Sequence, residues 1–222
     1  MRNLITLRNI DVGFSLGINL LSNINLNIKE KDFLLITGSN GSGKSTLLKL
    51  FYMKVLPTKG EFFIFNNLIS KDKKKEIIKL RKKLGVILQN NFLIPYLSVA
   101  QNIQLSIQIQ INENIRMYDR VNEIIDWVGL KGLGEKKIFD LSEGQKQKVI
   151  IARALVTKPK ILIADEPMNN LDKETKDKLY FLFQQINNLG TTIIMTTKNI
   201  SVHEKIKKCR LFFIKQKSLI EQ

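Results

Sequence analysis

Residues 38–46 read Gly-Ser-Asn-Gly-Ser-Gly-Lys-Ser-Thr, a spacing of glycine, lysine and hydroxyl residues that suits phosphate binding. An apolar, strand-like run at 33–37 precedes them, and a helix-like run at 47–51 follows. The glycines let the backbone turn back on itself, so that its N–H groups and the helix N-terminus converge on one phosphate-sized volume. The sequence therefore predicts a loop that binds the phosphates of a nucleotide.

The end of this loop carries the expected contacts with ATP and Mg²⁺. Lys44 supplies a point charge for the β and γ phosphates, and the hydroxyl of Ser45 is placed to bind the Mg²⁺ that bridges them. The alternative is a chance glycine-rich turn, but the match of all fixed positions between the right flanking elements favours the phosphate loop. The residues expected to hold the nucleotide are Gly38, Ser39, Asn40, Gly41, Ser42, Gly43, Lys44, Ser45 and Thr46.

A second apolar run, at 161–164, ends in two acids, Asp165 and Glu166. We expect Asp165 to hold Mg²⁺, directly or through water. We expect Glu166 to point at the γ-phosphate and to orient or deprotonate the attacking water. The alternative is that the two acids merely begin a surface loop, but an apolar strand that ends abruptly in two acids favours the catalytic interpretation.

Residues 141–145, Leu-Ser-Glu-Gly-Gln, precede an unbroken helix-forming run at 146–156. Ser142 is a suitable N-cap, and Gly144 admits a close backbone approach, so this helix start is a second candidate anion site. A two-fold dimer would place each ATP between the loop of one subunit and this helix of the other. An ordinary capped helix remains the alternative.

Length and composition favour one soluble α/β domain. The chain has 222 residues, of which 44% are hydrophobic, enough for one full core and few for two. It has no apolar run long enough to cross a bilayer, and its first residues lack a signal-peptide core. The single cysteine, Cys209, excludes an intrachain disulfide and any cysteine-based metal cluster, which fits a reducing cytoplasm.

The formal net charge of +16 raises the question of a polyanionic partner. Only seven of the 36 basic residues are arginine, and lysine is spread along the chain, which favours a coding bias over a nucleic-acid-binding surface. Residues 71–83 concentrate the charge, with seven lysines and one arginine. They are interpreted as a solvated helix face, or one that faces anionic lipid.

Strand-like and helix-like patterns alternate along the chain. The predicted strands lie near 3–8, 18–28, 33–37, 61–65, 85–88, 161–164, 192–196 and 211–220, and the predicted helices near 44–53, 73–83, 117–128, 143–157 and 173–189. Residues 102–111 alternate apolar and polar side chains, which by periodicity alone predicts a further strand.

The order of the motifs resembles that of the ATP-binding cassette (ABC) ATPases over nearly the whole chain. The phosphate loop is followed by Gln89, by the signature at 141–145, by the acidic strand and by Asp172 in Asn-Leu-Asp. The resemblance implies an α/β P-loop fold with a RecA-like core, an N-terminal antiparallel β region and an inserted α-helical subdomain. That subdomain would span approximately 90–156 of a single domain, 1–222, and would make 102–111 helical. We adopt this second prediction for the segment.

The resemblance also implies roles for individual residues. Gln89 would contact Mg²⁺ and the attacking water and couple the site to a membrane partner, and Asp172 would communicate across the dimer. Phe14 lies where the family has an aromatic that stacks on adenine. Ser142, Gly144 and Gln145 would contact the nucleotide from the second subunit.

Within the family, segments such as 80–89, 164–172 and 189–195 most resemble the cell-division ATPases of the FtsE group, with the LolD lipoprotein-export and macrolide-exporter ATPases next. This implies a peripheral ATPase on the cytoplasmic face of the inner (plasma) membrane, a homodimer on ATP binding, and an integral membrane partner resembling FtsX. A LolD-like exporter subunit and an ATP-gated scaffold with little hydrolysis are the alternatives. No specific nucleic acid is expected.

Two positions depart from the family pattern. Lys198 stands where the family has a histidine that positions water and glutamate, and Glu143 stands where glycine is usual. A lysine has donors only, on a flexible stem, so we predict intact ATP binding and weak hydrolysis. The only histidine, His203, is interpreted as a helix-surface residue rather than a shifted replacement. Glu143 is expected to turn outward as a first-turn acid.

Overall fold

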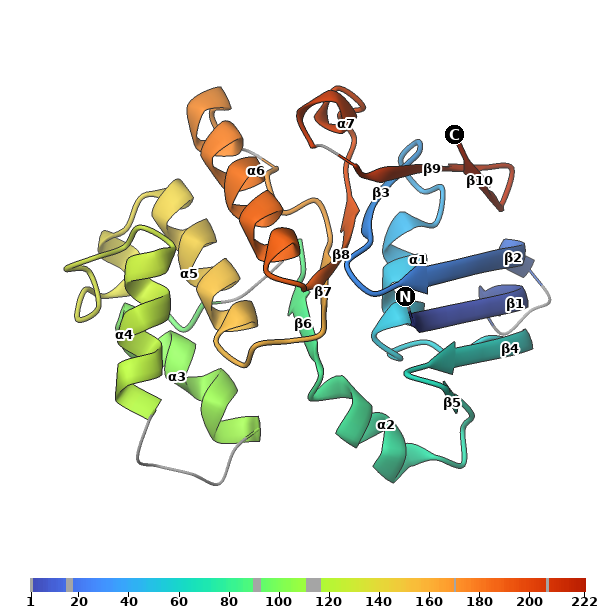
Figure 1. Cartoon of the computed structure of the whole chain (residues 1–222), viewed down its shortest axis with the longest axis horizontal. Helices are drawn as coiled ribbons and strands as arrows, with labels where there is room; N and C mark the ends of the chain where they lie inside the picture. The colour runs from blue at the N-terminus through green and yellow to red at the C-terminus, as the bar shows by residue number, and fades with distance from the viewer. Residues whose placement is uncertain (1, 15–17, 90–92, 111–116, 170, 207) are drawn as a thin grey trace.

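A six-stranded sheet forms the centre of the computed structural model, which describes residues 2–14, 18–89, 93–110, 117–169, 171–206 and 208–222 (Figure 1). Its strand order is β10-β9-β3-β8-β7-β6, and all neighbours are parallel except β10 and β9. These strands are β3 (Phe33–Thr37), β6 (Leu84–Ile87), β7 (Ile161–Ala164), β8 (Thr192–Thr196), β9 (Arg210–Lys215) and β10 (Ser218–Glu221). The single strand predicted at 211–220 is thus a hairpin of two.

The middle strands are apolar throughout because both of their faces are covered. All five residues of β3 are buried, with Leu34 and Ile36 in one core and Phe33 and Leu35 in another. Alternate residues of a strand point to opposite faces, so a strand covered on both sides has no polar face. This places the carboxyl ends of β3, β7 and β8 at one edge of a rigid sheet.

A smaller antiparallel sheet packs over one face of the central sheet, with α1 (Lys44–Phe51) in the core between them. Its order is β2-β1-β4-β5, formed by β1 (Asn3–Phe14), β2 (Ile18–Lys29), β4 (Lys59–Ile64) and β5 (Asn67–Leu68). The expected α/β class and N-terminal antiparallel region are therefore confirmed.

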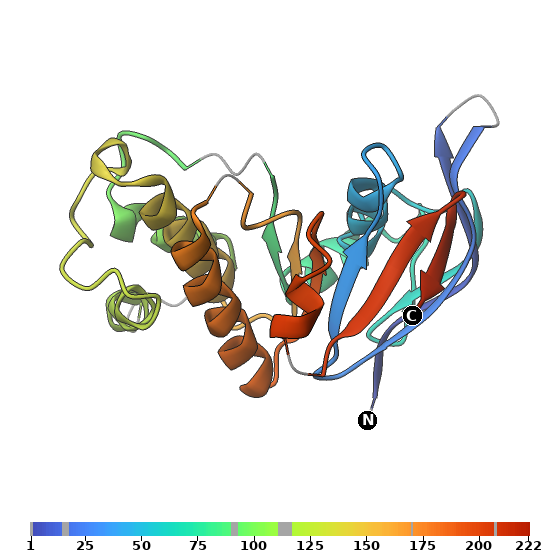
Figure 2. The same cartoon turned by 90° about the horizontal axis from the view of Figure 1, so that it is seen from above.

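The remaining helices lie mainly on the other side of the central sheet, where Figures 1 and 2 both place α3, α4 and α5 away from the antiparallel sheet. They are α2 (Lys74–Arg81), α3 (Val99–Gln110), α4 (Met117–Trp127), α5 (Glu143–Leu155), α6 (Lys173–Asn188) and α7 (Val202–Lys205), with a 3₁₀ turn at Ile138–Asp140. No helix in the described part of the chain is long and apolar enough to span a membrane.

The alternating pattern at 102–111 is not a strand, so the prediction from periodicity was wrong. Residues up to 110 belong to α3, and 111 lies outside the described residues. Val99, Ile103 and Ile107, four residues apart, are all buried in a core shared with α4 and α5. That spacing defines one helix face, which the alternation of isoleucine and glutamine obscures.

Local hydrogen bonds also favour the helix. Gln101 donates its backbone N–H to Ser98 Oγ (3.2 Å), and Ser98 donates its own to Gln101 Oε1 (2.8 Å), which is a capping box. The buried Asn102 fixes the chain before the helix, since its Oδ1 accepts from the Ile94 N–H (2.8 Å) and its Nδ2 donates to the Ile94 carbonyl (3.1 Å).

Candidate active site

The predicted phosphate loop connects the buried strand β3 to α1, as the sequence indicated. Gly38 has a φ of 154° and Gly43 a φ of 106°. A Cβ atom at Gly38 would lie 2.7 Å from Ser42 Oγ and 2.9 Å from the Ile214 carbonyl oxygen, and one at Gly43 would lie 2.9 Å from Leu21 Cδ2. Glycine is therefore required at both positions by close packing and by backbone conformation.

Lys44 lies within the loop rather than on the surface. Its side chain is buried, and Nζ donates to the carbonyl oxygens of Gly38 (2.8 Å) and Ser39 (3.0 Å). The ammonium group is thus held over the loop backbone, where a phosphate would meet it.

Two unsatisfied features of the loop fit an anion. The Ser42 hydroxyl is buried without a hydrogen-bond partner among the described residues, and no side chain caps the first turn of α1, whose N-cap is Gly43. Buried polar groups without partners are rare, and free N–H groups at a helix start attract negative charge. A cleft of about 880 Å³ runs beside the loop between Leu20 and the β9–β10 hairpin.

The two predicted acids follow β7 at the same edge of the sheet as the loop. Asp165 is buried, and its Oδ1 accepts a hydrogen bond from Thr196 Oγ1 (2.7 Å), at the end of β8. The same hydroxyl accepts from the Glu166 N–H (2.9 Å). Thr196 therefore holds both acids in place, a role that sequence reasoning missed. The sequence did place Thr196 at the end of a predicted strand, and this position could have indicated its role.

Glu166 is held in an unusual conformation. Its φ is 44°, a left-handed value that is uncommon for a residue other than glycine, and such strain clusters at functional sites. Its side chain is only 10% exposed, and Oε2 lies 3.1 Å from Lys198 Nζ. Asn169 Nδ2 donates to the same oxygen (3.2 Å). Lys198 therefore contacts the predicted catalytic carboxylate, and Asn169 is a second contact not foreseen from the sequence.

Gln89 lies two residues beyond β6 and is exposed. Asp165 donates its backbone N–H to the carbonyl of Ile87, the last residue of β6 (2.8 Å), so Gln89 follows a strand end next to Asp165. Phe14 is the last residue of β1, and its predicted contact with adenine involves a side chain outside the described residues.

The signature at 141–145 begins α5. Ser142 Oγ accepts from the Gln145 N–H (3.3 Å), and Gln145 Oε1 accepts from the Ser142 N–H (2.9 Å), forming a capping box. A Cβ at Gly144 would lie 3.1 Å from Thr175 Cγ2 on α6. The Glu143 side chain is 78% exposed and pairs with Lys146 on the same helix (2.8 Å), as its outward placement predicts.

The signature and the phosphate loop do not meet in one chain. The cleft beside the loop is lined by residues of β2, the loop and the C-terminal hairpin, and by none of residues 141–145. Asp172 is the N-cap of α6, where its Oδ1 accepts from the Thr175 N–H (2.9 Å). This hydrogen bond lowers the pKa of Asp172 below its ordinary value.

Comparison with known proteins agrees with this geometry. The family model described as "ABC transporter" matches residues 21–169. The cell division ATP-binding protein FtsE of Bacillus subtilis is 36% identical over 86% of this chain and 84% of its own length. The methionine import ATP-binding protein MetN 3 of Bacillus cereus is 38% identical over 84% of this chain and 55% of its own.

Among solved structures, the dimeric post-hydrolysis state of the ATP-binding cassette MJ0796 bound to ADP and Pi has a TM-score of 0.88 and 32% identity, and it aligns over 98% of this chain and 97% of its own. The cbiO1 protein of Clostridium perfringens, part of the cbiONQ transporter complex, has a TM-score of 0.90 and 31% identity, over 99% and 88%. With a family model matched over most of its length and relatives above 30% identity, this chain belongs to the ABC transporter family of ATP-binding proteins.

Proposed function

We propose that this protein hydrolyses ATP slowly and that two copies of it enclose two ATP molecules. The observation that carries the proposal is the loop at 38–46, where a buried lysine, a buried unpartnered hydroxyl and an uncapped helix start face the same edge as Asp165 and Glu166. Phosphate is the anion that this combination of charge and N–H donors suits best.

Glu166 is the proposed base or orienting group for the attacking water. Its carboxylate is largely buried, and its Oε2 already forms an ion pair with Lys198 and accepts a hydrogen bond from Asn169. Because these two donors compete with a water molecule for the same oxygen, Lys198 would slow hydrolysis without affecting the phosphate loop.

Mg²⁺ would neutralise charge on the β and γ phosphates when it is bound with ATP. The hydroxyl of Ser45, the carboxylate of Asp165 and the amide of Gln89 are oxygen donors of the type that Mg²⁺ prefers. Ser45 lies in the first turn of α1, and Asp165 and Gln89 follow neighbouring strands, β7 and β6, at the carboxyl edge.

The second subunit is needed because the signature lies apart from the loop within one chain. The start of α5 would approach the ATP bound to the partner copy, with Ser142, Gly144 and Gln145 as its contacts. Asp172, at the start of α6, would lie near the dimer interface. The dimeric MJ0796 cassette, which is similar over nearly the whole chain, supports this arrangement.

In the cell, we assign the protein to a membrane complex that acts in division. FtsE proteins of Bacillus subtilis and of Streptococcus pneumoniae, each 36% identical, support this assignment. ATP-driven closure of the dimer would be transmitted through the Gln89 region to an integral membrane partner resembling FtsX, with this chain peripheral on the inner membrane.

A transport role is the second candidate, favoured by the 38% identity with a methionine import protein. A LolD-like exporter subunit belongs to the same class of function. The Lys198–Glu166 contact favours a third version, in which ATP gates a scaffold that hydrolyses little. Fold and nucleotide chemistry do not distinguish the cargo.

The ATP proposal is tested with Lys44→Met, since this variant removes the ammonium group and keeps an unbranched apolar stem. ATP affinity measured by calorimetry should fall at least roughly 100-fold, because charged hydrogen bonds to phosphate are lost. The matched control is Lys49→Met, which removes an equal charge one turn further along α1. Equal affinities in the two variants would contradict the proposal.

The cellular role is tested by purifying the protein with its membrane partner. A four-span partner with a modest extracellular loop supports the division role. A partner with a larger periplasmic domain, or a lipoprotein receptor, supports export, and a substrate-importing permease supports the import class.

A further inference from the structure

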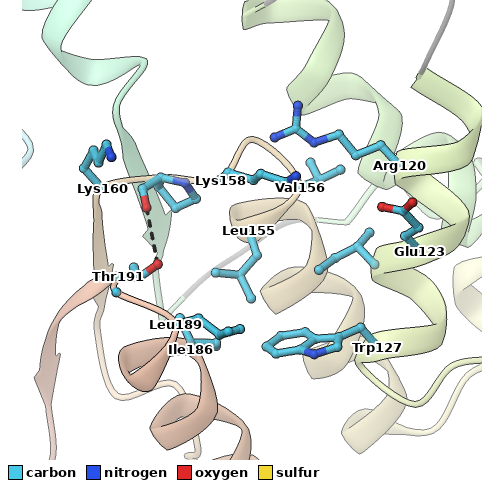
Figure 3. A pocket seen from close by; sticks show the side chains of 13 residues that line it. Arg120, Glu123, Trp127, Leu155, Val156, Lys158, Lys160, Ile186, Leu189 and Thr191 are labelled. Atoms are coloured by element: carbon cyan, nitrogen blue, oxygen red, sulfur yellow. Dashed lines mark hydrogen bonds between the residues drawn. The ribbon is translucent and has the colours of Figure 1, made fainter. Parts of the chain in front are cut away.

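A separate cavity of about 460 Å³ lies between α4, the end of α5 and the α6–β8 turn (Figure 3). Its lining residues at 158–160 and 189–191 precede β7 and β8. The acids and Lys198 follow those same strands, so the cavity opens at the edge of the sheet opposite the nucleotide site. Its volume is within the range of sites that bind small molecules, roughly 300–1,000 Å³.

The walls of the cavity are mainly apolar. Leu155, Val156 and Ile186 are buried at its floor, while the side chains of Trp127 and Leu189 stand at its mouth. Figure 3 shows Trp127 on α4 facing Leu189 and Ile186 across the opening, with Leu155 between the two walls. Trp127 is 41% and Leu189 77% exposed, which is high for large apolar side chains. A ligand with an apolar body would cover them.

The rim of the cavity carries an excess of positive charge. Arg120, Lys158 and Lys160 line it together with a single carboxylate, that of Glu123. None of the three cations forms a salt bridge with another residue of the described part of the chain. An anionic group would therefore be attracted to this rim.

Arg120 gives the site a specific donor. Its Nε is buried and has no hydrogen-bond partner among the described residues. Burial lowers the pKa of Arg120, and the nearby Glu123 carboxylate raises it in part. A guanidinium group stays charged in proteins, and leaving one of its buried N–H groups without an acceptor costs free energy. A ligand that accepts a hydrogen bond from this N–H would remove that cost.

We propose that this cavity binds a small anionic amphiphile, whose aromatic or aliphatic body packs between Trp127 and Leu155 and whose anionic group accepts hydrogen bonds from Arg120. Lys158 and Lys160 add charge complementarity at the rim. The ligand would touch α4 and α5 on one side and the α6–β8 turn on the other. It would therefore stabilise one arrangement of the helical region relative to the central sheet, and ATP affinity would change reciprocally if ATP alters that arrangement.

The binding test uses the full-length protein and does not depend on ATP. Trp127 is the only tryptophan in the chain, so all tryptophan fluorescence is emitted from the mouth of this cavity. The probe is 8-anilinonaphthalene-1-sulfonate, and the neutral control is N-phenyl-1-naphthylamine, which has the same aromatic body without the sulfonate. The sulfonate probe should quench Trp127 emission saturably and bind more tightly than the neutral one.

Two variants test which residues supply the positive charge that attracts the sulfonate. Arg120→Gln should weaken sulfonate binding roughly tenfold and leave binding of the neutral probe within about twofold. Lys158→Gln, an exposed substitution that leaves the apolar walls intact, should weaken it roughly threefold. The matched control is Arg8→Gln, which removes the same charge from an exposed position of β1 and should change nothing.

Three outcomes would overturn the proposal. Equal sulfonate affinity in the Arg120→Gln and Arg8→Gln proteins would exclude a role for Arg120. Equal affinity for the charged and neutral probes would exclude an anion site. If neither probe quenched Trp127 saturably, the cavity would not bind a small amphiphile, and this surface would bind either a macromolecule or no ligand.

Discussion

The phosphate loop and the acidic edge of the sheet are built by contacts of different range. Lys44 reaches Gly38 and Ser39, six and five residues away in the chain. Thr196 reaches Asp165 and Glu166 across 31 and 30 residues, and Lys198 contacts Glu166 from the same distant segment. The loop is therefore a local structure, whereas the acidic edge exists only when β7 and β8 are correctly paired.

This difference separates ATP binding from hydrolysis. The loop would supply one subunit's own phosphate contacts from one continuous segment. The proposed catalytic group, Glu166, is instead held by Thr196 and Lys198 from a distant segment of the chain. Changes at Glu166 or Lys198 should therefore alter the hydrolysis rate while leaving affinity for ATP nearly unchanged.

The largest expected effect is that of Glu166→Gln. A side chain that accepts or orients a proton contributes typically 10²–10⁴-fold to a rate, so phosphate release should fall by roughly that factor. ATP affinity measured by calorimetry should stay within about threefold, because the phosphate contacts are in the loop. Glu174→Gln, at an exposed acid paired with Lys178, is the matched control. If Glu166→Gln left the rate of phosphate release unchanged, another group would have to activate the water.

Replacing Lys198 by histidine should have the next largest effect, in the opposite direction. The change removes a donor that contacts Glu166 Oε2 and supplies an imidazole able to position water. A gain of a few kcal/mol in alignment corresponds to roughly 100-fold, so phosphate release should rise by about that factor. Lys176→His is the control, since Lys176 lies on the neighbouring α6 beside the same segment. Equal rates in the Lys198→His and parent proteins would refute the prediction of weak hydrolysis.

The range of the contacts also explains which parts were predictable from sequence. The loop, the acidic strand and the cap at Ser142 follow local rules, and the predictions for their elements were confirmed. The contacts of Glu166 with Lys198 and Asn169 were not predicted, because no pattern along the chain reports how two strand ends meet. The segment at 102–110 misled for a different reason, since polar and apolar residues alternate along a helix whose buried face carries Ile103 and Ile107.

Thr196→Val should reduce stability and so test the acidic edge directly. Valine keeps the shape of threonine but leaves the buried Asp165 Oδ1 and the Glu166 N–H without their shared partner. An unsatisfied buried group costs about 1–3 kcal/mol, and the free energy of unfolding in urea should fall by that amount. Thr196→Ser restores the hydroxyl and should recover most of the loss. If valine and serine are equally stable, the hydroxyl does not hold the two acids.

The smallest effect is expected at a local contact remote from both regions, the capping box at the start of α3. Ser98→Ala removes the oxygen that accepts the Gln101 N–H, which costs about 1 kcal/mol at an N-cap. For a chain of this size, the melting temperature should fall by about 2–4 °C. Ser106→Ala, in the interior of the same helix, is the matched control and should have no cost, since alanine has the higher helix propensity. Because the capping box involves neither the loop nor the acidic edge, ATP affinity and phosphate release should both stay unchanged. If Ser98→Ala lost hydrolysis but kept ATP binding, α3 would also support the acidic edge. Hydrolysis would then depend on contacts that extend into the helical region.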